Sequence, residues 1–309
     1  MTIRYDRPVS HAATGAYRLG IAGIVLLVVA ILAHRFGPLT TPDFVALVLI
    51  AAIPASLAVP LALFGLMRLW QVGARGGVAA GKALFCAALP LAMVGSFAYS
   101  YVSRPQIYEV STDLVDVPRW LTPPSANQQW LPRPSETTAR QREAQYQAYP
   151  ALIGRRYEGA LDRVYEGVVK TAAASGFTVV ATRGQEYAMP DITDQPLAPS
   201  TEEAPADNLA VIPVPLPRPA PLELRPALAP GEVDPGLPPG TVLIQAETRS
   251  LVLGLRFDIV IRLREEAETT LVDLRLASRY GPHELGMAAG LAEGYLHALD
   301  AELLGIAGN

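Results

Sequence analysis

The stretch that decides the fold of the polar half is GLRFDIVIRLR, Gly254–Arg264, followed by TLVDLRLAS, Thr270–Ser278. Within both stretches apolar residues alternate with charged ones. In the first, the apolar residues are Phe257, Ile259, Ile261 and Leu263. A period of two predicts strands with one face in a core and the other toward water. Because only a short acidic connection separates the stretches, we expect them to form an antiparallel hairpin.

Further elements flank this hairpin on both sides. Val242–Arg249 predicts a preceding strand, and His283–Leu304 carries apolar residues on one stripe, as a helix does. Upstream, apolar residues at three- and four-residue steps predict a helix over Gly154–Ser175, and the β-branched stretch Phe177–Ala181 predicts a short strand. This order indicates an α+β domain in two layers, an antiparallel sheet with helices on one face.

A proline-rich insertion, Pro190–Gly240, lies between the predicted strands Phe177–Ala181 and Val242–Arg249. It holds half of the chain's 28 prolines. Such a composition excludes a helix or central strand and favours polyproline II. Two interpretations stay open, a solvated loop and a strap laid on a partner. We favour the strap, because apolar residues alternate with prolines within Ile212–Pro219. Its expected partner-contact residues are Ile212, Val214, Leu216, Pro217 and Arg218.

The part that precedes the domain divides into two segments. Residues 104–150 are polar, punctuated by prolines and without a sustained period, which predicts an extended strap. We therefore divide the chain into a membrane anchor at 1–103, the strap at 104–150, and the α+β domain at 151–309 with its insertion at 190–240.

Three apolar runs make up the predicted anchor: Ala16–Ala33, Phe44–Leu69 and Ala83–Val102. Each approaches the ~20 residues that cross a ~30 Å hydrocarbon core. Lys and Arg gather before the first run and between the second and third, which predicts a cytoplasmic N-terminus and a domain on the far side. We thus expect a bacterial inner-membrane protein with a periplasmic domain. Because no ionisable residue lies midway along a run, the runs indicate an anchor or a contact surface, not a conducting path.

Several motifs of the soluble part together resemble domain of unknown function 1499, over roughly residues 105–309. They are IQAET (Ile244–Thr248), FDIVIRL (Phe257–Leu263), LVDLRLASRYG (Leu271–Gly281), HELG (His283–Gly286), IYEVSTDLVDVPRW (Ile107–Trp120) and QAYPALIG (Gln147–Gly154). The resemblance implies a fold and a compartment, but no reaction. The chain departs from the family in the proline-rich insertion, and in the last helix, where Ala288 and Gly290-Leu291 replace the family's Asn and basic residues.

Charged residues on the predicted strands are the candidate site. By alternation Asp258 and Arg262 share one face, as do Asp273 and Arg275, and Arg279 follows the last strand. One interpretation is a structural ion-pair face in which Asp258 and Asp273 partner the arginines. The other is an anion- or headgroup-binding surface formed by Arg262, Arg275 and Arg279.

Evidence for catalysis is missing from the sequence. His283 and His297 are the histidines of the soluble part, with no carboxylate or cysteine at metal-ligand spacing, and the single cysteine, Cys86, lies in the third apolar run. The chain also lacks nucleophile-elbow and phosphate-loop motifs. A net charge of −4 gives no electrostatic case for nucleic acid. We therefore expect a protein that is not an enzyme, with no catalytic residue, metal or cofactor.

Two functional hypotheses follow from these observations. The leading one is a non-enzymatic accessory protein that binds and stabilises a larger membrane protein complex while anchored in the lipid bilayer. The alternative is a periplasmic sensor or carrier that binds a small anionic or lipid ligand on the side of Arg262, Arg275 and Arg279.

Overall fold

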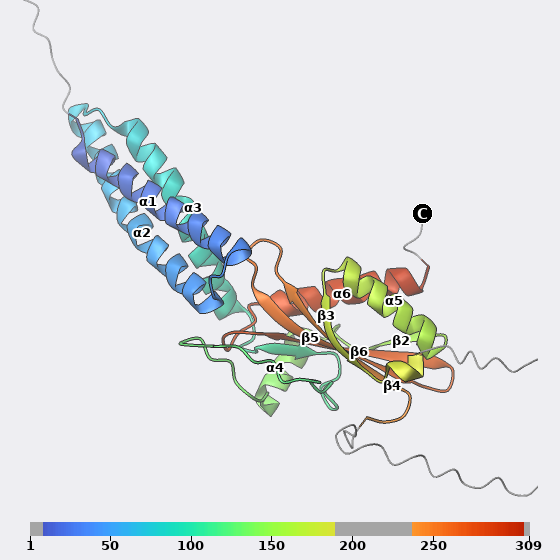
Figure 1. The fold of residues 1–309 in the computed structure, drawn as a ribbon. Helices are drawn as coiled ribbons and strands as arrows, with labels where there is room; N and C mark the ends of the chain where they lie inside the picture. The colour runs from blue at the N-terminus through green and yellow to red at the C-terminus, as the bar shows by residue number, and fades with distance from the viewer. Residues whose placement is uncertain (1–8, 189–236, 306–309) are drawn as a thin grey trace, which may run out of the picture.

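The computed structural model describes residues 9–188 and 237–305. Its N-terminal part is a bundle of three helices, α1 (His11–Phe36), α2 (Thr41–Val72) and α3 (Gly77–Ser103). Each is long and apolar enough to cross a membrane. The helices run side by side with the domain at one end of the bundle (Figure 1). At the other end Val9 and Arg75 form a β-bridge, so the N-terminal segment and the α2–α3 connection lie together.

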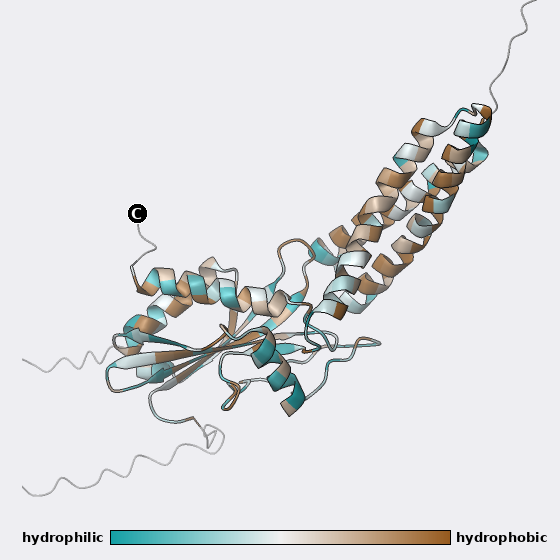
Figure 2. Cartoon of the chain, turned by 180° about the vertical axis from the view of Figure 1, so that it is seen from behind, coloured by the Kyte–Doolittle hydropathy of each residue, from teal (hydrophilic) through white to brown (hydrophobic). Residues whose placement is uncertain are grey.

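Small residues close the bundle on itself. A Cβ added at Gly20 would lie 2.9 Å from the carbonyl oxygen of Ala83 on α3, and one at Gly65 would lie 2.9 Å from the Cβ of Ala13. Such close backbone approach is how helices associate where lipid removes the hydrophobic drive. Hydrophobic residues therefore remain on the outer faces of the bundle (Figure 2).

The domain is built on one antiparallel sheet of six strands in the order β1-β6-β5-β4-β3, with β2 also paired to β6. The strands are β1 (Glu109–Ser111), β2 (Arg155–Glu158), β3 (Thr178–Arg183), β4 (Thr241–Arg249), β5 (Arg256–Glu265) and β6 (Thr269–Ser278). The predicted α+β class, with three apolar helices before an antiparallel sheet, is thereby confirmed. The predicted hairpin is β5–β6, with Ile261 opposite Leu274.

Helices α5 (Leu161–Ala174) and α6 (Met287–Leu303) cover one face of this sheet (Figure 1). The alternating apolar residues of β5 form the core together with side chains of both helices, among them Val168 and Leu299. This packing explains the period of two in the sequence, because Phe257, Ile259, Ile261 and Leu263 belong to this core and are each at most 1% exposed.

The opposite face of the sheet is also covered, which corrects the expectation of a face toward water. Segment 104–150, which we call the strap, lies across it and contains β1 and a helix, α4 (Ala139–Ala148) (Figure 1). Beneath the strap Asp258 and Asp273 are 2% exposed and Arg262 is 6% exposed. Gln245 of β4 holds the strap by exchanging two hydrogen bonds of 2.9 Å with the backbone of Thr122.

Two elements differ from the sequence-based prediction. The predicted helix Gly154–Ser175 begins only at Leu161, because Arg155–Glu158 pairs with β6 and Gly159 turns the chain at φ +129°. The strap is not extended throughout, since the capping box of Thr138 and Gln141 starts α4. A short 3₁₀ helix, η1 (Gln185–Ala188), ends the first described part, and the expected contact residues Ile212, Val214, Leu216, Pro217 and Arg218 lie outside the described residues.

Candidate functional site

Arg262 is the most heavily engaged of the three candidate arginines. Its Nε and Nη2 donate to Oδ2 of Asp273 on the neighbouring strand, at 3.2 and 2.7 Å. Its two Nη atoms also reach the strap, at 2.7 Å from Asp116 and 2.9 Å from Asp113. Burial lowers the pKa of Arg262, but the hydrogen bonds and charge of Asp273 outweigh burial and raise it. Arg262 therefore stays protonated and ties the strap to the sheet.

Arg275 makes a similar set of contacts further along the strap. Its Nε and Nη2 donate to Glu109 at 3.1 and 2.7 Å, and its Nη1 donates to the carbonyl of Pro118 at 3.0 Å. The guanidinium also lies 4.7 Å from the ring centroid of Trp120. This stacking on an aromatic face adds a cation–π contact to the ion pair.

Arg279 closes the row at the end of the sheet nearest the bundle. It donates to the buried Asp258 and, at 2.7 Å, to Glu247. Arg133 of the strap reaches the other oxygen of Asp258 at 3.4 Å. Each of the three candidate arginines is thus neutralised by carboxylates, and none presents an open guanidinium edge for an outside anion. The arrangement attaches the strap to the sheet.

The first turn of α6 is likewise occupied by the chain's own groups. Glu284, which is fully buried, accepts from the backbone N–H of Ala288 at 2.7 Å and from the hydroxyl of Tyr149 at 3.2 Å. A carboxylate at this place is stabilised by the helix dipole. That amide is therefore taken by Glu284 and is not free for an external anion.

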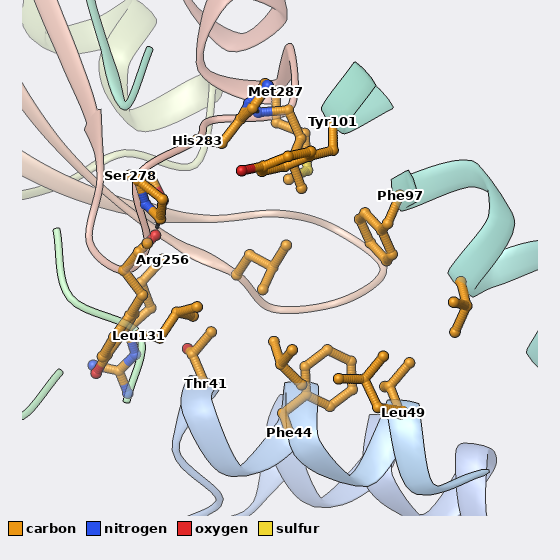
Figure 3. A pocket seen from close by; sticks show the side chains of 18 of the residues that line it. Thr41, Phe44, Leu49, Phe97, Tyr101, Leu131, Arg256, Ser278, His283 and Met287 are labelled. Atoms are coloured by element: carbon orange, nitrogen blue, oxygen red, sulfur yellow. Dashed lines mark hydrogen bonds between the residues drawn. The ribbon is translucent and has the colours of Figure 1, made fainter. Parts of the chain in front are cut away.

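A cavity of about 370 Å³, which we call the junction pocket, lies where the bundle meets the domain. Its volume falls within the ~300–1,000 Å³ that is typical of ligand pockets. The side chains converge on it from α2, from α3 and from the bundle-facing end of the sheet (Figure 3). The apolar lining comprises Phe44, Val45, Val48, Leu49, Met93, Val94, Phe97, Leu131, Leu255, Phe257, Leu285 and Met287.

One polar group in the pocket wall has no partner. His283 is 7% exposed, and its Nδ1 accepts from the backbone N–H of Leu285 at 2.8 Å. Nε2 therefore carries the proton of the neutral ring, and it has no hydrogen-bond partner among the described residues. The ring lies 5.0 Å from that of Tyr101. Leu285 itself adopts φ +58°, a left-handed conformation that is strained for a residue of this size.

The pocket has its shape because the domain is fastened to the bundle beside it. His34, near the end of α1, donates from Nδ1 to the carbonyl of Leu253 in the β4–β5 turn at 2.6 Å. Its Nε2 accepts from the hydroxyl of Thr41 at 3.1 Å, and its ring stacks on Phe44. At a second place Gly286, with φ +78°, lies so close to Arg104 that no other residue fits there without displacing it.

Comparison with known proteins finds a family model to which the C-terminal part of the chain is similar. Residues 230–299 match the family model described as Protein of unknown function (DUF1499). No curated protein matches the chain, and no solved structure does. The DUF1499 match contains β4, β5, β6 and most of α6, whereas the strap motif Ile107–Trp120 lies outside it.

The DUF1499 segment supplies only part of the junction pocket, and sequence reasoning did not find the pocket. Its walls join Phe44, Tyr101, Leu255 and Met287, which are far apart in the chain and come together only when the domain docks on the bundle. The unusual HELG stretch was one available signal, because it places a histidine and a strained leucine directly before α6. Among the described residues no cluster of potential metal ligands is present.

Proposed function

We propose that this chain is a non-enzymatic, membrane-anchored protein of the bacterial inner membrane whose periplasmic domain holds a lipid chain in the junction pocket. The observation that carries the proposal is the pocket itself, an apolar cavity enclosed jointly by two membrane-spanning helices and the end of the DUF1499 sheet. The distribution of Lys and Arg around the spans supports the orientation.

A lipid chain suits this pocket better than a soluble polar ligand. Two of its walls belong to α2 and α3, whose outer faces meet hydrocarbon, so a chain can enter from the bilayer without crossing water. The lining is almost entirely aliphatic and aromatic, and a polar ligand would lose its hydration there without replacement. Filling the pocket with a chain removes apolar surface from water, which is favourable.

The test uses the intact protein in lipid nanodiscs that contain a phospholipid with a photoactivatable acyl chain. After illumination, labelled peptides are identified by mass spectrometry. We expect labelling at Met287, which lines the pocket at the start of α6 on the domain side. Met287 belongs neither to the spanning helices nor to the β4–β5 turn, so labelling there distinguishes a chain in the pocket from a chain in the surrounding bilayer.

A matched pair of variants makes the result specific. Ala98→Trp fills the pocket from α3, and Ala92→Trp places the same bulk on an exposed face of the same helix away from the pocket. We expect Ala98→Trp to abolish labelling of the Met287 peptide and Ala92→Trp to retain it. Labelling confined to the spanning helices in the unmodified protein would contradict the proposal.

A further inference from the structure

Among the described residues, two arginines beside the junction pocket lack acidic partners of the kind that Arg262, Arg275 and Arg279 have. Arg249 ends β4 and Arg256 begins β5, and they face each other directly in the strand register. Neither forms an ion pair with any residue that the structure describes. The acid on the same face of β4, Glu247, is already engaged by Arg279 at 2.7 Å. Like charges opposite each other destabilise a sheet, so this pair needs an explanation.

A third cation lies close to this pair. Arg35, near the end of α1, packs against the β4–β5 turn, where a Cβ added at Gly254 would lie 3.3 Å from its Cδ. Partial burial, followed by the charges of Arg256 and Arg35, lowers the pKa of Arg249. We call Arg35, Arg249 and Arg256 the junction arginines. The charge of Glu247 offsets part of their mutual repulsion at Arg249, and an anion placed among the three arginines would relieve the rest.

The position of the junction arginines indicates which anion this is. The β4–β5 turn is bound through Leu253 to His34 in the last turn of α1, a helix long and apolar enough to cross a membrane, so in a bilayer the turn would lie where that helix emerges. At its tip Leu251 and Val252 are 88% and 73% exposed, as suits a turn that dips into a bilayer interface. Phosphate groups of the lipids occupy this same level.

The charged and apolar parts of the site are also continuous. Arg256 is among the residues that line the junction pocket (Figure 3). Its chain neighbours Leu255 and Phe257 line the pocket as well. A molecule with its chain in the pocket would therefore carry its head toward the junction arginines. The unpartnered Nε2–H of His283 lies in the same wall, and the ester carbonyl of a lipid is an acceptor of the kind it lacks.

From this arrangement we infer that the junction site binds a phospholipid of the leaflet facing the domain. One acyl chain fills the pocket, and the phosphate binds Arg249, Arg256 and Arg35. This inference rests on the proposed function and adds the chemical class of the ligand to it. Charge-assisted hydrogen bonds from guanidinium groups to a phosphate would supply the affinity and orient the lipid.

The experiment compares two lipid probes in nanodiscs. Phosphatidylglycerol and diacylglycerol carry the same photoactivatable acyl chain, but only phosphatidylglycerol has a phosphate. We expect the phospholipid probe to label the Met287 peptide about tenfold more than the diacylglycerol probe, as hydrogen bonds to a charged group predict. The double variant Arg249→Gln/Arg256→Gln should reduce phospholipid labelling to the diacylglycerol level. Arg264→Gln, a change on the same face of β5 at its other end, should retain full labelling.

The possible outcomes distinguish failure of the phospholipid inference from failure of the proposed lipid-chain function on which it rests. If neither probe labels the Met287 peptide, the proposed lipid-chain function fails. If both probes label it equally and the double variant changes nothing, the pocket holds a chain but the phosphate assignment is overturned. If both probes label the peptide equally while inorganic phosphate raises the melting temperature of the unmodified protein and not that of the double variant, the arginines bind free phosphate and the phospholipid assignment is overturned.

A stability measurement guards against variants that fail to fold. In detergent without phospholipid the double variant should melt at or above the temperature of the unmodified protein, because it removes a like-charge pair. Added phosphatidylglycerol should raise the melting temperature of the unmodified protein and leave that of the double variant unchanged, since only a bound ligand stabilises. An equal rise in both proteins would contradict the inference.

Discussion

Asp273 shows how a buried charge depends on its partners. Its side chain is 3% exposed, and Arg262 supplies two hydrogen bonds to one of its oxygens while Thr112 donates to the other at 3.2 Å. Taking a carboxylate out of water is unfavourable, so the pair is tolerated because both members are present. The same arginine, Arg262, also holds the strap through its hydrogen bonds to Asp113 and Asp116.

We therefore predict that Arg262→Ala destabilises the protein by about 3–5 kcal/mol, because it leaves Asp273 buried without its main partner. As a control, Lys170→Ala removes an exposed partner of Glu302 and should cost at most about 1 kcal/mol. Denaturant unfolding of the purified protein in detergent measures both. Equal effects of the two substitutions would show that the strap-facing ion pairs contribute no more than surface pairs.

Asp113 links the same network to pH. Burial raises the pKa of its carboxyl, but amide hydrogen bonds from Asp116 and Val115 and the Arg262 guanidinium outweigh burial and lower it below its ordinary 3.8. A depressed pKa contributes stability that is present above the unfolded value and is lost as the pH falls through the folded one. Asp113→Asn should thus melt lower than the unmodified protein at neutral pH. Below pH 3.8 the gap in melting temperature should shrink, and a gap independent of pH would refute the assignment.

At the scale of the elements, the sequence predicted strands well where one face meets a continuous core. The alternation within Phe257–Leu263 identified β5 and its orientation, because each apolar side chain packs on α5 or α6. It did not reveal that the polar face is covered, since charged residues look the same whether they meet water or buried ion pairs. The short strand β2 was missed because its four residues pair with β6 through backbone groups, which leave no side-chain pattern.

The candidate site was less predictable than the fold. Alternation placed Asp258, Arg262, Asp273 and Arg275 on one face, and the structure has all four on the side of the strap. The additional acids that Arg262 and Arg275 meet, Asp113, Asp116 and Glu109, belong to the strap, and its proline-rich sequence does not specify its path. The junction pocket depends on docking between two separately folded parts, and periodicity within one element carries no information about such docking.

Deleting the proline-rich segment Asp191–Pro238 tests whether the fold depends on it. The segment leaves and re-enters at neighbouring strands, since Arg183 of β3 pairs with Leu243 of β4. We predict that the shortened protein folds with an unchanged melting temperature, because a short turn closes these strands at little entropic cost. If the proline-rich segment binds a partner, the amount of that partner that co-purifies with the shortened protein should fall. A deletion variant that keeps all its association would decide for the solvated loop.

For the molecule as a whole, the arrangement of the bundle makes a topological prediction. The α2–α3 connection and the domain lie at opposite ends of the bundle (Figure 1). Reporter fusions after Gly73 and after Glu109 should therefore report opposite sides of the membrane, cytoplasmic and periplasmic respectively. The same side for both would refute three crossings. Reversed sides would refute the orientation.

Association with a larger membrane protein complex stays a prediction of the sequence. Intact protein extracted in mild detergent should migrate with a large assembly if it is an accessory subunit, and near its own mass of 33.0 kDa plus detergent if it acts alone. Size-exclusion chromatography with light scattering distinguishes these two results. A lone species that still carries phospholipid would argue against the accessory role and for the lipid-binding one.

The double fastening of the domain, through His34 to Leu253 and through the close contact of Arg104 with Gly286, has a consequence for modularity. Most membrane anchors are interchangeable, because a flexible tether only determines location. Here two of the three helices, α2 and α3, line the junction pocket itself, so the bundle and the domain form this cavity together. A chimaera with a foreign anchor would reach the correct compartment and still lack two walls of its pocket. A protein that contained the domain without α2 and α3 would therefore keep the fold of the domain but would lack the junction pocket.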